Sequence, residues 1–190
     1  PVVGLVGSNN LSTAIIILGI AVILIFVANP QFLPFLWIGG TGVGFIGIFL
    51  SLESYRLERL AIWRNPELYE KGYQTMQGLY AIGSGGLFGV GLGESMQKLG
   101  FVPEAQNDMI FSIICEELGL TGAVAVLVIF GLLIWRLMVI ATWTKDLFGA
   151  LLAAGVMGHI MIQVILNVAV VTNTIPNTGI TLPFVSYGGT

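Results

Sequence analysis

Charged residues are scarce in this chain of 190 residues: Asp, Glu, Lys and Arg make up 9% of it, against about a quarter of an average soluble domain. Hydrophobic residues make up 56%, so too few charges remain to cover a water-soluble surface, and a soluble globular protein is excluded. A net charge of -3 offers no basic surface for nucleic acid. The single cysteine, Cys115, excludes an intrachain disulfide and any multi-cysteine metal or iron–sulfur site. The composition is that of an integral membrane protein.

Long apolar runs divide the chain. Residues 1–52 carry no charge, and Asn29-Pro30-Gln31 breaks this stretch into two runs. Each run is close to the roughly 20 apolar residues that cross a bilayer. The sequence predicts an all-α membrane protein with four spanning helices at residues 11–28, 32–52, 118–140 and 147–171. Because the chain has no initiator methionine, we expect it to be an excerpt of a longer protein, with a complete four-helix protein as the alternative.

The segment 53–117 holds 14 of the 17 charged residues, so we expect it to be an aqueous loop between the second and third spans. Within it, residues 73–82 are typical of a short amphipathic helix at the membrane interface, with Met76, Leu79 and Tyr80 on one side. The glycine-rich stretch 83–93 predicts tight turns against membrane helices, or N–H groups exposed to an anion. The short basic connection 136–145 favours the cytoplasm, which places the long segment outside.

Two groups of polar residues are candidates for function. Asp108 stands directly before an apolar run, where desolvation would raise its pKa toward that of a general base. If a helix begins near Pro103, Glu104 shares its first turn with Asp108, although helix-capping acids give the same pattern. In the fourth span, His159, Gln163 and Asn167 follow at intervals of four and lie on one helix face. They are expected to form interhelical hydrogen bonds or to line a substrate groove.

Several motifs together resemble a known family. They are Tyr73-Gln74, Ala81-Ile82-Gly83-Ser84-Gly85-Gly86, Gly89-Val90-Gly91-Leu92-Gly93, Gln97-Lys98, Pro103-Glu104-Ala105, Asp108, Glu116-Glu117-Leu118-Gly119 and residues 178–189. In this order they are similar to the SEDS family, bacterial ten-helix peptidoglycan glycosyltransferases that include FtsW, RodA and SpoVE. Residues 91–98 resemble the division-type FtsW and sporulation-type SpoVE pattern more than RodA. Gln106 departs from the family, which usually has histidine there, and so weakens any role for an imidazole.

The resemblance implies that residues 1–190 are part of one SEDS-type transmembrane domain and correspond to family helices six to nine. It places residues 53–117 and 172–190 on the outer face of the bacterial plasma membrane, at the division septum. The implied activity is inverting hexosyl transfer that polymerises the lipid-linked disaccharide-pentapeptide, lipid II, into glycan strands during cell division. A lipid II flippase, an elongation- or sporulation-type polymerase, and a structural division-site scaffold are the alternatives. The implied partners are a class B penicillin-binding protein transpeptidase and other division proteins.

The resemblance also assigns residues to roles. Asp108 corresponds to the family's essential acid and would act as general base, or hold a divalent cation such as Mg²⁺ or Mn²⁺. No cofactor is otherwise implied. The expected substrate-binding residues are Lys98, Gln97, Glu104, Arg56, Arg59, Ser186 and Gly188. Of these, the three basic side chains are the candidates for contact with the lipid diphosphate.

Overall fold

The structure is a computed structural model that describes residues 11–28, 40 and 54–187, with the backbone alone for residues 11 and 54–58. This part of the chain contains helices and turns and no strand. It forms two compact units, which are described separately. The first unit comprises Pro1–Glu58 with Leu133–Ile162, and the second comprises Arg59–Leu132 with Gln163–Thr190. The helices are α2 (Leu11–Ala28), α4 (Ser54–Arg64), α5 (Tyr73–Gly85), α6 (Ile110–Trp143) and α7 (Leu147–Val171), with short 3-10 turns at Pro66–Leu68, Glu70–Gly72 and Gln97–Leu99.

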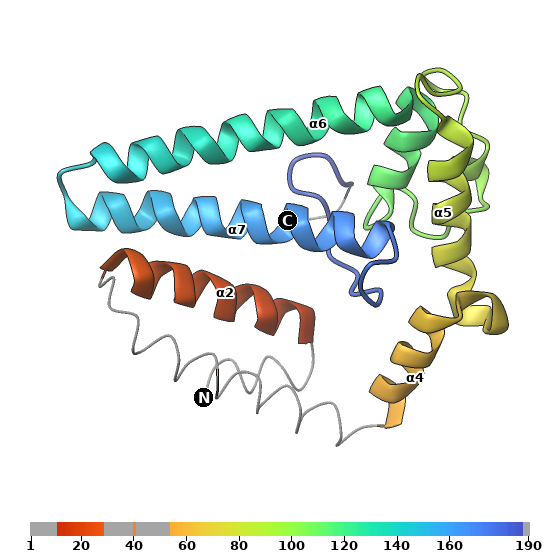
Figure 1. Ribbon diagram of the computed structural model, residues 1–190, viewed down its shortest axis with the longest axis horizontal. Coiled ribbons are helices and arrows are strands. Elements are labelled where there is room, and N and C mark those ends of the chain that lie inside the picture. The colour runs from red at the N-terminus through yellow and green to blue at the C-terminus, as the bar shows by residue number, and fades with distance from the viewer. Residues whose placement is uncertain (1–10, 29–39, 41–53, 188–190) are drawn as a thin grey trace. The chain divides into compact units, whose positions relative to one another are not determined.

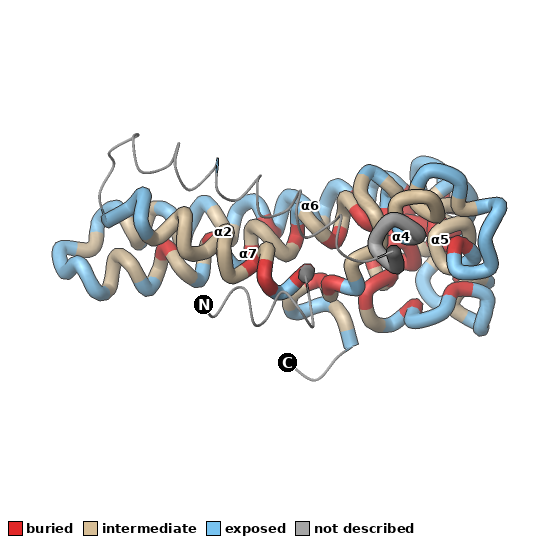
Figure 2. The backbone as a smooth tube through the Cα atoms, turned by 90° about the horizontal axis from the view of Figure 1, so that it is seen from below, coloured by how far each residue is buried: buried red, intermediate tan, exposed pale blue. Residues whose placement is uncertain are grey.

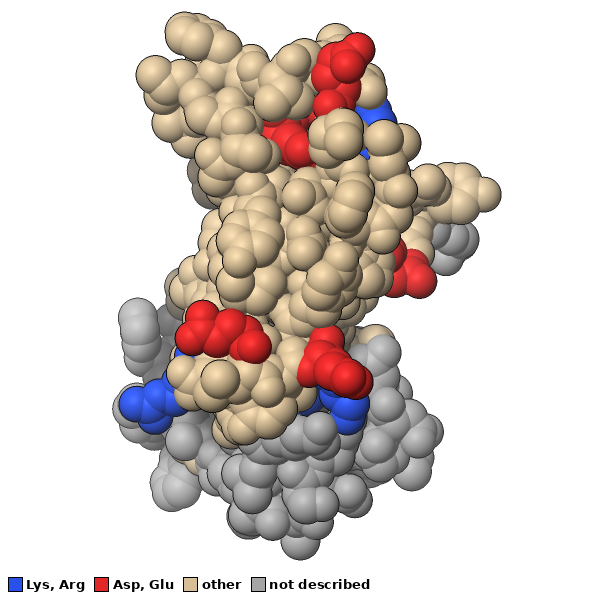
Figure 3. Space-filling model, turned by 90° about the vertical axis from the view of Figure 1, so that its right-hand side faces the viewer, with Lys and Arg blue, Asp and Glu red and all other residues tan. Residues whose placement is uncertain are grey.

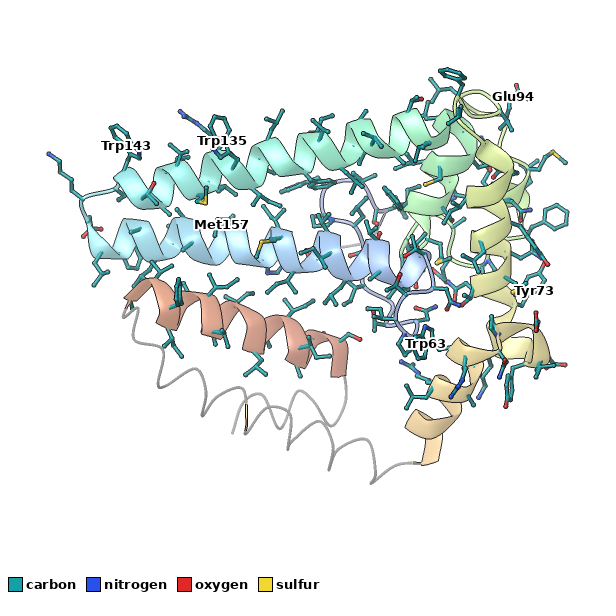
Figure 4. The ribbon with its side chains drawn as sticks, in the orientation of Figure 1. Trp63, Tyr73, Glu94, Trp135, Trp143 and Met157 are labelled. Atoms are coloured by element: carbon teal, nitrogen blue, oxygen red, sulfur yellow. The ribbon has the colours of Figure 1, made fainter. Side chains whose placement is uncertain are left out.

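In the first unit, the end of α6 and the first part of α7 form an antiparallel helical hairpin (Figure 1). Asp146 stands directly before α7 and caps it: its Oδ2 accepts a hydrogen bond of 2.9 Å from Gly149 N, satisfying a free N–H of the first turn. Trp135 and Trp143 project from α6 away from α7, whereas Met157 lies on the side of α7 that faces α6 (Figure 4). These exposed indoles are typical of a helix that meets lipid rather than water.

Helix α2 packs against α7 through small residues. A Cβ added at Gly19 of α2 would lie 2.5 Å from Ile162 Cδ1, and one at Gly158 of α7 would lie 2.7 Å from Ile23 Cδ1. Close approach of this kind depends on small residues, as in membrane helix pairs, where lipid supplies no hydrophobic drive for association. The packing explains why the first apolar run forms a helix with the predicted bounds, 11–28.

In the second unit, α5 confirms the predicted short helix and extends it to Gly85. Its buried side, however, consists of Gly78, Ala81 and Gly85 rather than the larger apolar residues. A Cβ at Gly85 would lie 1.9 Å from the Cys115 carbonyl oxygen, so α5 lies directly on the first turns of α6. Tyr80 is consequently exposed. Figure 2 shows the buried positions of this unit along α5, the loops that follow it and the beginning of α6.

The glycine-rich loop pairs with a break in α6. At Gly119 the backbone leaves the helix, with φ 66° and ψ -165°. Leu120 N and Thr121 N donate to the carbonyls of residues 86 and 87, at 2.9 and 3.1 Å, and Val90 N and Gly91 N donate to those of residues 116 and 117, both at 3.0 Å. A Cβ at Gly119 would lie 2.4 Å from Gly89 N. The loop's tight turn against a helix is thus confirmed, and its paired N–H groups are not available to an anion.

Helices α6 and α7, of 34 and 25 residues, are long enough and apolar enough to cross a membrane. The predicted span 118–140 lies inside α6, and the predicted span 147–171 coincides with α7. The predicted span 32–52 lies outside the described residues.

Candidate functional site

Asp108 ends a series of turns that precedes α6. The helix begins at Ile110 and not near Pro103, so the prediction that Glu104 and Asp108 share its first turn is wrong. Glu104 instead adopts φ 54°, a left-handed conformation that no helix continues through, and Asn107 N donates to its carbonyl at 2.9 Å. Glu104 is exposed, and its carboxylate accepts a hydrogen bond from the side-chain amide of Asn107.

Asp108 is buried, with 8% of the residue exposed. Its Oδ1 accepts a hydrogen bond of 3.2 Å from Gln74 Nε2 of α5. Burial raises the pKa of this carboxyl above its ordinary value and the nearby Glu104 raises it further, whereas the hydrogen bonds from its own backbone N–H and from Gln74 oppose the rise. The result is a carboxylate that ionises less readily than an exposed one, and that therefore takes up a proton more readily.

Asn177 connects Asp108 to a basic side chain. Its Nδ2 donates to Gln74 Oε1 at 3.1 Å, and its carbonyl oxygen lies 3.4 Å from an Nη atom of Arg59, which donates to it. Arg59 is exposed. The structure therefore brings one predicted basic residue within two side chains of Asp108. Arg56 lies in α4, and its side chain is outside the described part of the chain.

The polar stripe of α7 divides in the structure. Asn167 is completely buried, and its Nδ2 donates to the carbonyls of Asp108 and Ile180, at 2.8 and 2.7 Å. Gln163 is half-buried and His159 is exposed. Of the three, Asn167 forms the expected hydrogen bonds to other segments, and it fixes the backbone at Asp108.

The segment after α7 folds over the turn that carries Asp108. Ser186 Oγ donates to the carbonyl of Asn107 at 2.6 Å and accepts from Leu182 N at 2.8 Å, while Tyr187 N donates to the carbonyl of Gln106 at 2.7 Å. Ser186 thus lies beside the site, where its hydroxyl closes a loop. Gly188 lies outside the described residues.

Lys98 and Gln97 belong to a second group. Lys98 Nζ lies 2.6 Å from Glu117 Oε1, forming a partly buried ion pair. Beside it, the buried Glu116 accepts hydrogen bonds from Ser95 Oγ and from the backbone N of residue 96. Gln97 Oε1 is buried without a hydrogen-bond partner. These contacts attach the 95–98 turn to α6. On the face that bears α5, charged side chains form small separate groups with uncharged surface between them (Figure 3).

The described residues do not fit a protein-built metal site at Asp108. Among them no group of three or more His, Cys, Asp or Glu side chains is placed to hold an ion. The only acid that the structure brings near Asp108 on its own loop is the exposed Glu104.

Sequence reasoning missed Gln74 and Asn177 as parts of the site. Gln74 is part of the Tyr73-Gln74 motif, but no regular spacing in the sequence connects it to Asp108, which lies 34 residues further along the chain. Asn177 follows a proline in a segment without charge, where nothing in the sequence marks a partner. Their roles arise from the way α5 and the segment after α7 meet at Asp108.

Comparison with known proteins shows what this chain is similar to. A family model for FtsW, RodA and SpoVE, described as "Cell cycle protein", matches residues 1–190. Stage V sporulation protein E of Bacillus subtilis is 45% identical over 183 residues, which cover 95% of this chain and 50% of that protein. A probable peptidoglycan glycosyltransferase FtsW of Dichelobacter nodosus is 48% identical over 145 residues, covering 74% of this chain and 36% of the relative.

A solved structure is similar as well. It comes from work titled "Structural coordination of polymerization and crosslinking by a peptidoglycan synthase complex" and matches with a TM-score of 0.77 at 29% identity, over 99% of this chain and 53% of that one. This chain spans about half the length of the curated relatives that it matches.

Proposed function

We propose that this chain, which belongs to the FtsW, RodA and SpoVE family of cell cycle proteins, forms the part of a peptidoglycan glycosyltransferase that carries its general base. The reaction is polymerisation of lipid II into glycan strands, and relatives named probable peptidoglycan glycosyltransferase FtsW support this proposal. Division is the favoured setting, since most of the relatives compared carry the name FtsW.

The observation that carries this proposal is the burial of Asp108, whose carboxylate accepts a hydrogen bond from Gln74. In the transfer, a sugar hydroxyl of the acceptor gives its proton to the carboxylate while the hydroxyl oxygen forms a bond to C1 of the donor sugar. The bond from C1 to the diphosphate breaks, and the lipid diphosphate leaves. A base serves this step best when its pKa is raised toward the working pH, and the burial of Asp108 raises it in that direction.

Arg59 is the residue that we assign to the leaving diphosphate. Arg59 is an exposed residue at the outer end of the contacts that lead to Asp108, and guanidinium groups match phosphate geometry. Lys98 is a weaker candidate because Glu117 already neutralises its charge. Arg56, Gln97, Glu104, Ser186 and Gly188 remain predictions for substrate contact.

The membrane arrangement is part of the proposal. Residues 1–190 belong to one ten-helix transmembrane domain of the bacterial plasma membrane, with residues 53–117 and 172–190 on the outer face. There the site meets a substrate whose lipid tail lies in the bilayer. The partners are a class B penicillin-binding protein and other division proteins. The similar structure, from work on a peptidoglycan synthase complex, supports this assignment.

The test is glycan polymerisation by the full-length protein carrying Asp108→Asn, with purified lipid II as substrate. The substitution keeps an oxygen that can accept from Gln74 and removes the base, so polymer formation is expected to fall at least a hundredfold (about 10²–10⁴ for a general base). Wild-type polymer from a folded variant would overturn the assignment of Asp108. Movement of labelled lipid II across liposomes by wild type, without polymer, would indicate a flippase instead.

A further inference from the structure

The hydrogen bonds around Asp108 have a direction that the backbone sets. Gly179 N donates to Asn177 Oδ1 at 3.0 Å, and a backbone N–H can only donate. Asn177 must therefore present its oxygen to Gly179 and its Nδ2 to the other neighbour, Gln74 Oε1.

Gln74 is oriented in the same way. Because its Oε1 accepts from Asn177, its Nε2 faces two acceptors, the carbonyl of Pro103 and Asp108 Oδ1, both at 3.2 Å. The donors thus run from Gly179 N through the side-chain amides of Asn177 and Gln74 to the Asp108 carboxylate. We call this series of hydrogen bonds the relay. Gly179 also lies near the other carboxylate oxygen, since a Cβ added to it would lie 4.0 Å from Asp108 Oδ2.

We propose that Asn177 and Gln74 are positioning residues that pass the fixed donor direction of Gly179 to Asp108, holding Oδ1 as a hydrogen-bond acceptor so that the carboxylate is oriented to receive the substrate proton. This inference rests on the proposed function of Asp108. Residues 163–187 contain no Asp, Glu, Lys, Arg or His, and among the described residues the charged groups with contacts to this relay are Glu104 on the loop and Arg59 at the far end.

The variant Asn177→Asp tests the direction of the relay. It keeps the oxygen that accepts from Gly179 and the shape of the side chain, but places a second oxygen against Gln74 Oε1, where only a donor fits. Gln74 then loses its fixed orientation, and the hydrogen bond to Asp108 is lost. We expect kcat for lipid II polymerisation by the full-length protein to fall about tenfold or more, with KM changed by less than about twofold.

Asn173→Asp is the matched control. Asn173 lies in the same segment, and its amide donates to the carbonyl of Trp63 at 3.4 Å, outside the relay. The control adds the same charge and removes one hydrogen bond, so its kcat is expected to stay within about twofold of wild type. If Asn177→Asp fails to fold, Gln74→Glu decides the matter: it keeps the acceptor for Asn177 and removes the donor to Asp108.

The outcomes separate the relay from the catalytic assignment. A wild-type kcat for Asn177→Asp or Gln74→Glu, with Asp108→Asn inactive, overturns the relay and leaves the proposed function standing. A raised KM at constant kcat also overturns it, because these residues would then bind substrate. Polymer formation by Asp108→Asn would instead remove the base itself and the relay with it.

Discussion

Asn167 is predicted to be the strongest single anchor of the site. Its amide donates to two carbonyls of buried residues, at Asp108 and Ile180. In Asn167→Ala, each carbonyl that loses its donor costs about 1–3 kcal/mol, or about 2–6 kcal/mol together. Removal of Asn167 Oδ1, which is buried without a partner, offsets about 1 kcal/mol of this loss. We therefore expect a net loss of about 3 kcal/mol, within a range of about 1–5 kcal/mol.

The measurement is the free energy of reversible unfolding of the full-length protein in detergent, obtained by denaturant titration. Gln163→Ala is the control. Gln163 lies one turn earlier on α7, is half-buried and takes no part in these bonds, so its loss is expected to be about 0.5 kcal/mol. The isosteric Asn167→Asp places an oxygen against both carbonyls and is expected to be worse than Asn167→Ala. If Asn167→Ala proves as stable as Gln163→Ala, the anchoring role is refuted.

Three further predictions follow from other contacts. Gly119→Ala should lower the free energy of unfolding by at least about 3 kcal/mol. The φ of 66° disfavours any side chain, and the added Cβ would lie 2.4 Å from Gly89 N. Gly131→Ala, in open space on the same helix, should raise the free energy of unfolding by up to about 1 kcal/mol. Equal changes for Gly119→Ala and Gly131→Ala in the unfolding titration would contradict the break in the helix at Gly119. Burial raises the pKa of Asp108 above 3.8 in the folded protein, so its favourable contribution to stability is complete at low pH and is lost as pH rises through the folded pKa. Asp108→Asn should then be at least as stable as wild type at pH 7, and the acidic limb of wild-type kcat/KM should lie above pH 3.8. If the variant keeps its fold but is less stable than wild type, the pKa of Asp108 is not raised by folding. A double-mutant cycle of Lys98→Met with Glu117→Gln should give a coupling of about 0.5–1 kcal/mol that weakens in salt, and zero coupling would show that this pair adds no stability.

The helices could be predicted from the sequence because apolar runs of sufficient length leave few alternatives in a bilayer. The runs 11–28 and 147–171 have the predicted bounds in the structure. The start of α6 could not be predicted, because the apolar residues 110–115 belong to a helix that also carries Glu116 and Glu117. Charge there indicated an aqueous loop, whereas in the structure one carboxylate is held by Ser95 and the other by Lys98.

The burial of Asp108 could be predicted from the sequence, whereas its hydrogen-bond partners could not. Asp108 was identified by its place before an apolar run and by the family resemblance, and the structure shows the burial expected from that place. The buried side of α5 was missed because amphipathic patterns point to large residues, while contact with α6 selects Gly78 and Gly85. Long-range partners such as Gln74 and Asn177 leave no periodic trace.

The paired break in α6 makes the loop and the helix mechanically dependent on each other. Four backbone hydrogen bonds join residues 86–91 to the helix on both sides of Gly119. Lifting this loop would strand those donors and acceptors at the edge of an apolar span, where water is scarce. A residue inserted into 86–91 should therefore bend or unwind α6, whereas an insertion at the exposed Leu68–Glu70 turn, which has no such attachment, should be accommodated locally.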